Sequence, residues 1–499
     1  MTQKFDPKSI AGKFPLPELT TDLLVVGAGP SGVAEAIKAA KAGRTVTLVD
    51  ENPVAGALMG MDVPLFYGQR MTAAVQNKER MVEQVLASNA ALEEAFELGV
   101  DVQLGVYVWG AFVNGPGVQS LPCNVAGLAD EERSWMLGFS EIVVAAGARD
   151  LVLSFPGIEQ PGCMGAVALA ALLSRYDEFS GRRIVILGSG TLALETALKV
   201  LDSGREVAAL VEVRGEAQGP AELVAAVRAR GVEILTTHVI VEAVTNPLDG
   251  VEAAVLIAVD QAGKPVPGTE RRIDCDTICL AVGSVPNVEL LDILGCKLAP
   301  RGDLGGHVPV LDADGRTSVA AVRVVGASGG VAQDNDAFAY RLDWMRALLE
   351  VGGLGVHTCL CEEVTRAELL GVQPPRYLGC ASNKVAALSL DKMLEGGPAN
   401  HDQMKRLTRV SMGACQARRC REQVALLLAI ASGKSVAEIP LAGYRAPVRP
   451  LPLSVLSDDQ ETQAMRDDWD VWFGIATQWV PYDDIGTERE ARYGDNMHL

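Results

Sequence analysis

Short aliphatic runs, each followed by a glycine-rich turn and a helical stretch, dominate the first part of the chain. Residues 23–26 (LLVV) lead into GAGPSG, an alanine-rich stretch (VAEAIKAAKAG) and a second run at 45–50 (TVTLVD). Continuous aliphatic runs are typical of parallel strands that are buried on both faces. A strand, a helix and a second strand in this order predict a βαβ unit.

The same pattern returns at residues 182–212 (RRIVILGSGTLALETALKVLDSGREVAALVE) and extends to about residue 287. Alternating runs within 100–140 predict a small antiparallel insertion, and TSVAAVRVVG at 317–326 predicts a strand that returns to the first sheet. We therefore expect an α/β fold with two dinucleotide-binding, Rossmann-type domains. The first would comprise residues 1–155 and 290–350, and the second residues 156–289.

Two further parts are predicted in the rest of the chain. Residues 351–430 contain four cysteines in two close pairs and are expected to form a small α-rich domain, and residues 431–499 form a C-terminal extension. This extension is aromatic near Trp469, Trp472 and Trp479. Such a segment either packs on its own domain or docks another subunit, because Trp is enriched in interfaces.

The first glycine turn predicts a site for an adenine dinucleotide, because it follows a strand and opens a helix. Its glycines allow a tight turn and close approach to a pyrophosphate, and the helix N-terminus offers N–H groups to the phosphates. Asp50 ends the next strand, where it can accept hydrogen bonds from ribose hydroxyls, and its neighbour Glu51 is the second candidate. The predicted site residues are Gly27, Gly29, Pro30, Ser31, Gly32, Asp50 and Glu51.

The second glycine turn has Gly188, Gly190 and Ala193 at the same spacing, and Glu212 ends the following strand. Ala is an accepted third residue of this motif, and an acid after the strand favours NAD over NADP. Two alternatives stay open here. The site binds NAD, or the duplicated fold persists with its pocket filled.

The cysteine pairs are Cys359-x-Cys361 and Cys415-x4-Cys420. Soft thiolates in two close pairs suit a small iron–sulfur cluster or a zinc ion. Structural zinc sites more often use C-x2-C or a mixture of Cys and His, and disulfides are disfavoured in a chain without an export signal. Cys380 lies between the pairs and is an alternative ligand.

Composition narrows the function classes. The net charge of −19 argues against a nucleic-acid partner, whose phosphates would be repelled. No apolar run reaches the ~18 residues of a membrane span, and the N-terminus lacks the apolar core of a signal peptide. We therefore expect a cytoplasmic protein.

Four segments together resemble the flavoprotein oxidoreductases with two dinucleotide-binding domains: VVGAGPSGVAEAIKAAKAG, IVVAAGARDLVLSFPG with Gly147, GSGTLALETA and LAVGSVPN. More closely, the chain is similar to the larger subunit of multisubunit amine and imino-acid dehydrogenases. That group includes opine oxidases, hydrogen cyanide synthase, dye-linked proline dehydrogenase and heterotetrameric sarcosine oxidase. The likeness covers roughly residues 20–456.

The resemblance implies an alpha-type subunit that pairs with a smaller, flavin-bearing beta-type subunit, on which a small-molecule amine, opine or imino acid is oxidised. It implies FAD in the first site, a 2Fe–2S cluster and FMN at a subunit interface. By residue-by-residue carry-over, Cys359, Cys361, Cys415 and Cys420 are the cluster ligands. Ser411 and Ala417 replace residues that are usually Gly in this loop.

Two departures from the flavoprotein pattern concern the first site. The Gly-Asp whose Asp holds the flavin ribityl chain is matched by Gly326-Ala327, and the usual Gly-Gly-Gln is replaced by VAGALMG at 54–60. Relatives without the Asp can hold NAD or ATP in this pocket. FAD remains the first candidate, with NAD and ATP as alternatives.

No catalytic acid or base is indicated, which fits a chain whose substrate is oxidised on a partner. No cysteine precedes Cys123, which argues against a disulfide reductase of the same fold. The alternatives are a self-contained NADH-dependent flavoprotein reductase that passes electrons through the cluster, and a scaffold that binds a nucleotide permanently and carries the cluster.

Overall fold

The computed structural model describes residues 16–53, 68–114, 121–313, 315–379, 386–456, 484 and 486–489. Contacts between Cα atoms divide the chain into two compact units, residues 1–130 with 135–450 and residues 131–134 with 451–499. All the chemistry discussed below lies in the first unit. Within the described part of the chain, no helix has the length and apolar character needed to cross a membrane.

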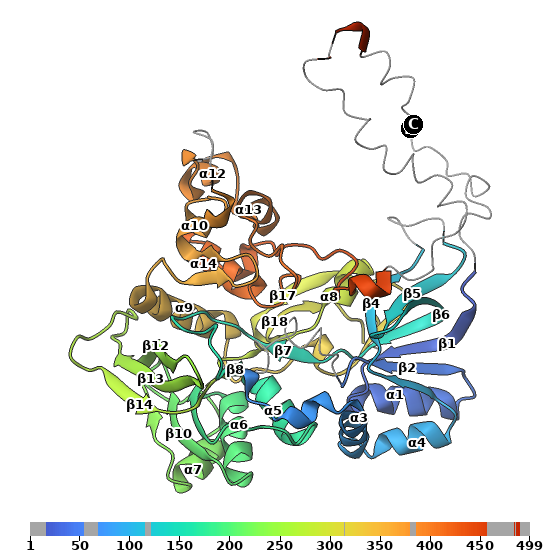
Figure 1. The fold of residues 1–499 in the computed structure, drawn as a ribbon, viewed down its shortest axis with the longest axis horizontal. Coiled ribbons are helices and arrows are strands. Elements are labelled where there is room, and N and C mark those ends of the chain that lie inside the picture. Colours follow the sequence, from blue (N-terminus) through green and yellow to red (C-terminus); the bar gives the residue numbers. More distant parts are fainter. Residues whose placement is uncertain are drawn as a thin grey trace. The chain divides into compact units, whose positions relative to one another are not determined.

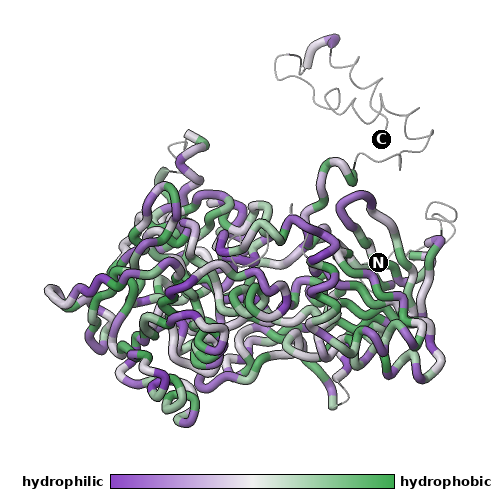
Figure 2. The backbone as a smooth tube through the Cα atoms, turned by 60° about the horizontal axis from the view of Figure 1, so that its bottom comes forward, coloured by the Kyte–Doolittle hydropathy of each residue, from purple (hydrophilic) through white to green (hydrophobic). Residues whose placement is uncertain are grey.

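The first sheet contains the predicted βαβ unit. Strands β1 (Leu19–Val26) and β2 (Val46–Asp50) are parallel neighbours, and α1 (Pro30–Lys41) connects them. The strand order is β3-β2-β1-β6-β5-β4. The strands of this sheet, at the right of Figure 2, consist mainly of hydrophobic residues. Figure 1 shows α1 and α4 (Ala91–Glu97) together on one face of this sheet. Leu23 and Val25 pack in the core with these helices, and Leu24 packs in a second core. Burial on both faces explains why the runs are continuously aliphatic.

Two sequence predictions about this sheet are confirmed. Strands β4 (Tyr107–Phe112) and β5 (Asn124–Ala129) pair antiparallel, as the alternating pattern predicts. The returning strand β19 (Val322–Val324) pairs parallel with β6 (Ser134–Val144). This pairing brings Gly326 back to the first glycine turn.

The second sheet has the order β11-β10-β9-β15-β8 and is parallel throughout. Its βαβ unit consists of β9 (Arg183–Leu187), α6 (Thr191–Asp202) and β10 (Glu206–Val211). A three-stranded antiparallel sheet, β12-β13-β14, is inserted in the chain between β11 and β15 of the second sheet. The sequence therefore predicts both Rossmann-type sheets correctly, whereas the four domain boundaries stay predictions.

The other elements have the following bounds: η3 (Ala73–Gln76), α3 (Lys78–Ala87), β3 (Asp101–Leu104), β7 (Ala148–Asp150), β8 (Cys163–Gly165), α5 (Ala166–Ser174), α7 (Ala221–Ala229), β11 (Ile234–Leu235), β12 (His238–Asn246), β13 (Gly250–Ala258), β14 (Arg271–Asp274), β15 (Thr277–Leu280), β16 (Ser284–Pro286), α8 (Glu289–Ile293), β17 (Leu298–Arg301), η4 (Gly302–Leu304), β18 (Gly306–Pro309), η5 (Gly326–Gly329), α9 (Ala337–Gly352), β20 (His357–Cys359), β21 (Val364–Thr365), α10 (Arg366–Leu370), η6 (Arg376–Leu378), α12 (Leu390–Gly396), α13 (His401–Thr408), α14 (Arg421–Ser432), η7 (Val436–Glu438) and α15 (Leu453–Leu456).

The segment that carries the four cysteines shares a hydrophobic core with the second sheet. One cluster of buried side chains includes Val185 of β9, Trp344 of α9 and Val424 of α14. Gln423 adds polar links, because it donates to the Thr358 carbonyl at 2.6 Å and accepts from the Ser154 amide at 3.0 Å. The segment that carries the cysteines, hereafter the cysteine module, is thus packed against the second sheet and hydrogen-bonded to the loop at Ser154.

A buried arginine ties three segments together at this junction. Arg366 is fully buried and donates to the backbone carbonyls of Leu348 (2.9 Å), Gly353 (2.8 Å) and Ser154 (2.6 Å). Burial lowers its pKa to about 10, so the guanidinium stays charged at neutral pH. The carbonyls supply the polar contacts that a buried charge needs.

We predict that Arg366→Met lowers the free energy of unfolding by about 3 kcal/mol or more, because it leaves three buried carbonyls without their donor. The expected result is a lower Tm in calorimetry. Arg346→Met in α9 is the control, since that side chain is half-exposed and its ion pair with Asp343 spans 3.8 Å. Exposed pairs contribute about 0–1 kcal/mol. Equal Tm values for the two variants would contradict this role of Arg366.

Candidate dinucleotide cavity and cysteine cluster

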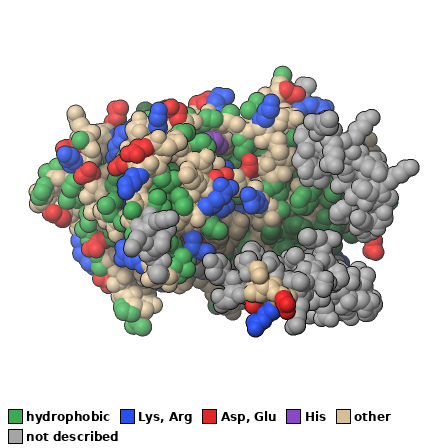
Figure 3. Space-filling view, turned by 90° about the horizontal axis from the view of Figure 1, so that it is seen from above, with side chains coloured by type: hydrophobic (Ala, Val, Ile, Leu, Met, Phe, Trp, Pro, Cys, Tyr) green, Lys and Arg blue, Asp and Glu red, His purple; other side chains and the backbone are tan. Residues whose placement is uncertain are grey.

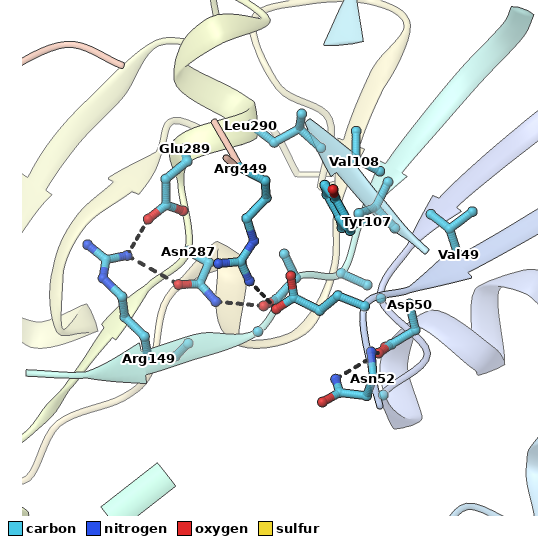
Figure 4. A pocket seen from close by; sticks show the side chains of 18 of the residues that line it. Val49, Asp50, Asn52, Tyr107, Val108, Arg149, Asn287, Glu289, Leu290 and Arg449 are labelled. Atoms are coloured by element: carbon cyan, nitrogen blue, oxygen red, sulfur yellow. Dashed lines mark hydrogen bonds and ion pairs between the residues drawn. The ribbon is translucent and has the colours of Figure 1, made fainter. Parts of the chain in front are cut away.

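A cavity of about 260 Å³ lies at the carboxyl ends of β1 and β2 and continues toward β7 and α8. Figure 4 shows its polar side chains gathered from several elements. The cavity is lined by Val26, Gly27, Gly29, Val49, Asp50, Glu51, Asn52, Val106, Tyr107, Val108, Ala145, Ala146, Gly147, Ala148, Arg149, Val167, Ala168, Ala171, Arg175, Asn287, Glu289, Leu290, Arg418, Val448 and Arg449.

The glycines of the first turn are required by its geometry. Gly27 has a φ of +110°, and a Cβ there would lie 2.3 Å from the Ala145 carbonyl oxygen. A Cβ on Gly32 would lie 1.9 Å from the Gly27 oxygen, so this glycine allows the helix to pack on the turn. Gly29 caps α1, and a Cβ on it would meet nothing within 4 Å. The N-terminus of α1 therefore faces open space suited to an anion.

The acids at the end of β2 line the same cavity. Asp50 accepts from the Ala28 amide at 2.5 Å and from the Asn52 side chain at 2.7 Å. Glu51 forms an ion pair with Arg449, which comes from the segment after the cysteine module. These contacts hold both carboxylates at the edge where a ribose diol would lie.

The predicted residues of the first site separate into two groups. Those that line the cavity are Gly27, Gly29, Asp50, Glu51 and Gly147. Pro30, Ser31, Gly32 and Gly326 do not line it. Gly326, with φ +67°, packs against Ser31, whose Oγ would lie 2.9 Å from a Cβ at Gly326. Their contact with a cofactor stays a prediction.

Arg149 organises the far end of the cavity and is not singled out by the sequence patterns. Its side chain is buried and donates to Glu289 at 2.7 Å, to Asn287 at 3.2 Å and to Glu422 at 3.0 Å. Burial alone would raise the pKa of Glu289, but the charges of Arg149 and Arg418 outweigh it and lower that pKa to about 2. The buried carboxylate is therefore ionised, and the ion pair is maintained at neutral pH.

The same arginine joins the cavity to the cysteine loop. Its Nε donates to the backbone carbonyl of Arg418 at 3.1 Å. Arg418 lies between Cys415 and Cys420, and its side chain lines the cavity. The loop that carries the second cysteine pair is thus part of the cavity wall.

The four cysteines come together in two contacts across the pairs. The thiol of Cys359 interacts with that of Cys420, and the thiol of Cys361 interacts with that of Cys415. The hydrogen bond from Cys361 lowers the pKa of Cys415, and Arg419 and Arg418 add to this effect. Cys361 is exposed, whereas Cys359, Cys415 and Cys420 are buried.

The described cysteines are all free thiols. Among the described residues, no group of three His, Cys, Asp or Glu side chains is arranged around a single ion position.

The loop before α14 has an unusual backbone. Ser411, Gln416 and Ala417 have φ values of 68°, 52° and 67°, a left-handed conformation that favours glycine. Ser411 and Ala417 are the positions where the resembling proteins usually carry Gly, and here they adopt the conformation that glycine favours. A Cβ on Gly413 would lie 2.3 Å from the Cβ of Cys361. Only glycine allows this approach.

A hydrogen-bonded chain reaches one of the thiols. His401 is fully buried, and its Nε2 lies 2.9 Å from the Ser411 Oγ, which lies 3.1 Å from the Cys420 sulfur. Burial and the charge of Arg421 lower the pKa of His401 to about 3, so the imidazole is neutral. The resemblance gives no role to His401 or Ser411, and only the fold brings them together.

The second glycine turn lies at the N-terminus of α6, as predicted. Gly188 has φ +115°, and a Cβ there would lie 2.6 Å from the Ala281 oxygen. Gly190 caps α6, and Glu212 follows β10 with its side chain fully buried. None of these three residues lines the 260 Å³ cavity.

Three sequence predictions lie outside the described residues: the VAGALMG segment at 54–60, the alternative ligand Cys380 and the aromatic tail with Trp469, Trp472 and Trp479.

Several known proteins are similar to this chain. An opine oxidase subunit of Agrobacterium tumefaciens (strain Ach5) is 25% identical over 470 residues, which cover 87% of this chain and 91% of that protein. The alpha subunit of sarcosine oxidase from Corynebacterium sp. (strain P-1) is 28% identical over 308 residues, which cover 61% of this chain and 30% of that protein. The crystal structure of L-proline dehydrogenase from P. horikoshii has the same fold, with a TM-score of 0.55 and 18% identity over 88% of this chain and 80% of that one.

The family model described as pyridine nucleotide-disulphide oxidoreductase matches residues 21–336. This span is more than half of the chain and contains both glycine turns. FAD and NAD(P) are the cofactors that this family implies. The chain is an oxidoreductase that belongs to the pyridine nucleotide-disulphide oxidoreductase family.

Proposed function

We propose that this chain is the electron-transferring subunit of a multisubunit flavin-dependent dehydrogenase or oxidase. The enzyme would act on the CH–NH bond of a secondary amine, an opine or an imino acid. One observation carries the proposal: the loop that holds Cys415 and Cys420 forms part of the dinucleotide cavity wall through Arg418. A cofactor in the cavity and a cluster on the loop would then lie on either side of this wall, an arrangement that supports electron transfer between them.

The cavity fits an adenine nucleotide cofactor. The open N-terminus of α1 at Gly29 would hold the phosphates, and Asp50 would accept from the ribose. FAD is the first candidate, with NAD or ATP as alternatives. A flavin bound here would supply conversion between two-electron and one-electron transfer.

The cysteine quartet fits a 2Fe–2S cluster, with Cys359, Cys361, Cys415 and Cys420 as ligands. Four thiolates around an oxidised cluster leave a net negative charge that needs compensation. Three buried arginines, Arg418, Arg419 and Arg421, lie in the same loop and at the start of α14. Charges and hydrogen bonds of this kind also set the reduction potential.

Substrate oxidation would take place on a partner. The relatives are named as subunits of opine oxidase and sarcosine oxidase, which supports a heteromeric enzyme. The partner that we propose is a smaller, flavin-bearing beta-type subunit, with FMN at the interface. In Figure 3, acidic and basic side chains are interspersed over the described part of the visible face.

A self-contained NADH-dependent reductase is the second candidate, because NAD(P) is a cofactor of the family. It would require NADH to bind at the second glycine turn and to reduce a flavin in the first cavity. Rapid bleaching of the flavin of the isolated chain by NADH would favour it.

We predict that Cys415→Ser removes the visible absorbance of the cluster and the EPR signal of its reduced state. A serine oxygen is a poor substitute for a soft thiolate. Cys296→Ser is the control, because that buried cysteine contacts Thr317 and lies in a different hydrophobic core. If both signals persist in Cys415→Ser, the ligand assignment is wrong.

We predict that Ser411→Ala lowers the reduction potential of the cluster. The Ser411 hydroxyl would donate to the Cys420 sulfur and stabilise the more negative reduced state. If the substitution makes one-electron reduction of the cluster on the order of tenfold less favourable, the reduction potential falls by ~59 mV. Ser432→Ala is the control, since its hydroxyl donates to the Leu428 carbonyl on the same helix. An unchanged potential in an EPR-monitored titration of Ser411→Ala would exclude this hydrogen bond as a determinant.

We predict that the purified chain alone does not oxidise amines and that activity appears when the partner is added. Glu51 and Glu289, which line the cavity, are held in ion pairs with arginines. The relatives are named as subunits. The measurement is reduction of an artificial dye by a panel of secondary amines, opines and imino acids. Robust amine oxidation by the isolated chain would contradict the proposal that the substrate is oxidised on the partner subunit.

A further inference from the structure

The second glycine turn differs from the first in what faces it. Helix α6 begins after Gly190, which has the same capping geometry as Gly29. A Cβ on Gly29 would meet nothing within 4 Å, but a Cβ on Gly190 would lie 3.0 Å from a carboxylate oxygen of Asp334. The two turns share a sequence motif, yet only the first is open.

Asp334 lies where a pyrophosphate would bind. Its Oδ2 accepts from the Thr191 amide at 2.6 Å, and its Oδ1 accepts from the Thr191 hydroxyl at 2.6 Å. The first N–H groups of a helix are the donors that hold phosphates in this fold. The carboxylate therefore satisfies one of these donors, and its charge would repel an arriving phosphate.

The acid that would hold the ribose is also engaged. Glu212 is fully buried, and one of its oxygens accepts from the hydroxyls of Ser189 and Tyr340, both at 2.6 Å. The other oxygen accepts from the Arg214 amide at 2.8 Å. Asp50 also accepts hydrogen bonds from the chain, but it lines the open cavity, whereas Glu212 is fully buried. A ribose diol could reach Glu212 only if Tyr340 moved away.

A network of side chains fixes the segment that carries Asp334 and Tyr340. The Arg214 guanidinium lies 5.1 Å from the centre of the Tyr340 ring and forms an ion pair with Asp343 at 2.7 Å. Gln218 accepts from Asn335 at 3.1 Å and from Arg214 at 2.9 Å. The start of α9 and the loop after β10 are therefore joined over the second turn.

We propose that Asp334 and Tyr340 close the second dinucleotide site, so that this chain excludes NAD(H) there while the first site stays open. The residues present at the second turn do not fit the dinucleotide that the family implies. The closure explains how the glycine motif persists without a ligand. Gly188 allows the turn to approach the Ala281 carbonyl, and Gly190 leaves room for the Asp334 carboxylate. This inference rests on the geometry of the second turn and is independent of the proposed electron-transferring role.

The test is photolabelling of the purified full chain with 8-azido-NAD, followed by peptide mapping. Peptides that span Gly27–Asp50 report the first site, and peptides that span Gly188–Glu212 report the second. The wild-type chain should show no competable label in the second set. The double variant Asp334→Gly/Tyr340→Phe should gain at least tenfold labelling there, in competition with NADH.

Asp202→Asn is the matched control, because it removes a carboxylate from the opposite end of the same helix. It should leave labelling of the second set at the wild-type level. Asp334→Asn keeps the side-chain volume and removes the charge, and it should also gain label if the double variant folds poorly. Stoichiometric labelling of the second set in the wild-type chain, or no gain in either Asp334 variant, would overturn the proposal.

Discussion

The hydrogen bonds and ion pairs of the buried Arg149 guanidinium are the interactions on which the dinucleotide cavity depends. A charge in this position needs several acceptors, and it finds them on separate parts of the chain: Asn287, Glu289, Glu422 and the Arg418 carbonyl. Removing Arg149 itself would leave the buried Glu289 carboxylate without its main counter-charge, which is strongly unfavourable. The far wall of the dinucleotide cavity and the cysteine loop are therefore one connected structure.

This connection places the cavity of the first glycine turn next to the cysteine loop. The first glycine turn opens into a cavity that ends at the cysteine loop, and the core under α14 is continuous with that of the second sheet. At the second turn, the chain fills its own site with Asp334 and Tyr340. Of the two glycine turns, the first thus opens into a cavity that adjoins the cysteine loop, whereas the second is covered by side chains of the chain itself.

Sequence patterns predict the parts of this structure that depend on local chemistry. Aliphatic runs give the strands of both sheets. The glycine spacing gives both turns, because the positive φ of Gly27 and Gly188 favours glycine at fixed positions in the sequence. Whether each turn is open or covered could not be predicted. At the second turn this depends on contacts between Thr191 and Asp334, which are 143 residues apart in the chain. The role of Arg149 is equally hidden in the sequence: it stands within the AAGARD segment, but its partners lie more than 130 positions away. The strained loop at Ser411 shows the same limit, because the left-handed conformation there is maintained by packing around the cysteines rather than by glycine.

The central claim is that one chain holds an iron–sulfur cluster beside an adenine nucleotide. The most direct measurement is analysis of iron, acid-labile sulfide and nucleotide released from the purified chain on denaturation. We expect about two iron atoms and two sulfides per chain, as for a 2Fe–2S cluster with four Cys ligands, together with one adenine nucleotide. A chain that contains zinc in place of iron, or iron without a bound adenine nucleotide, would contradict the claim.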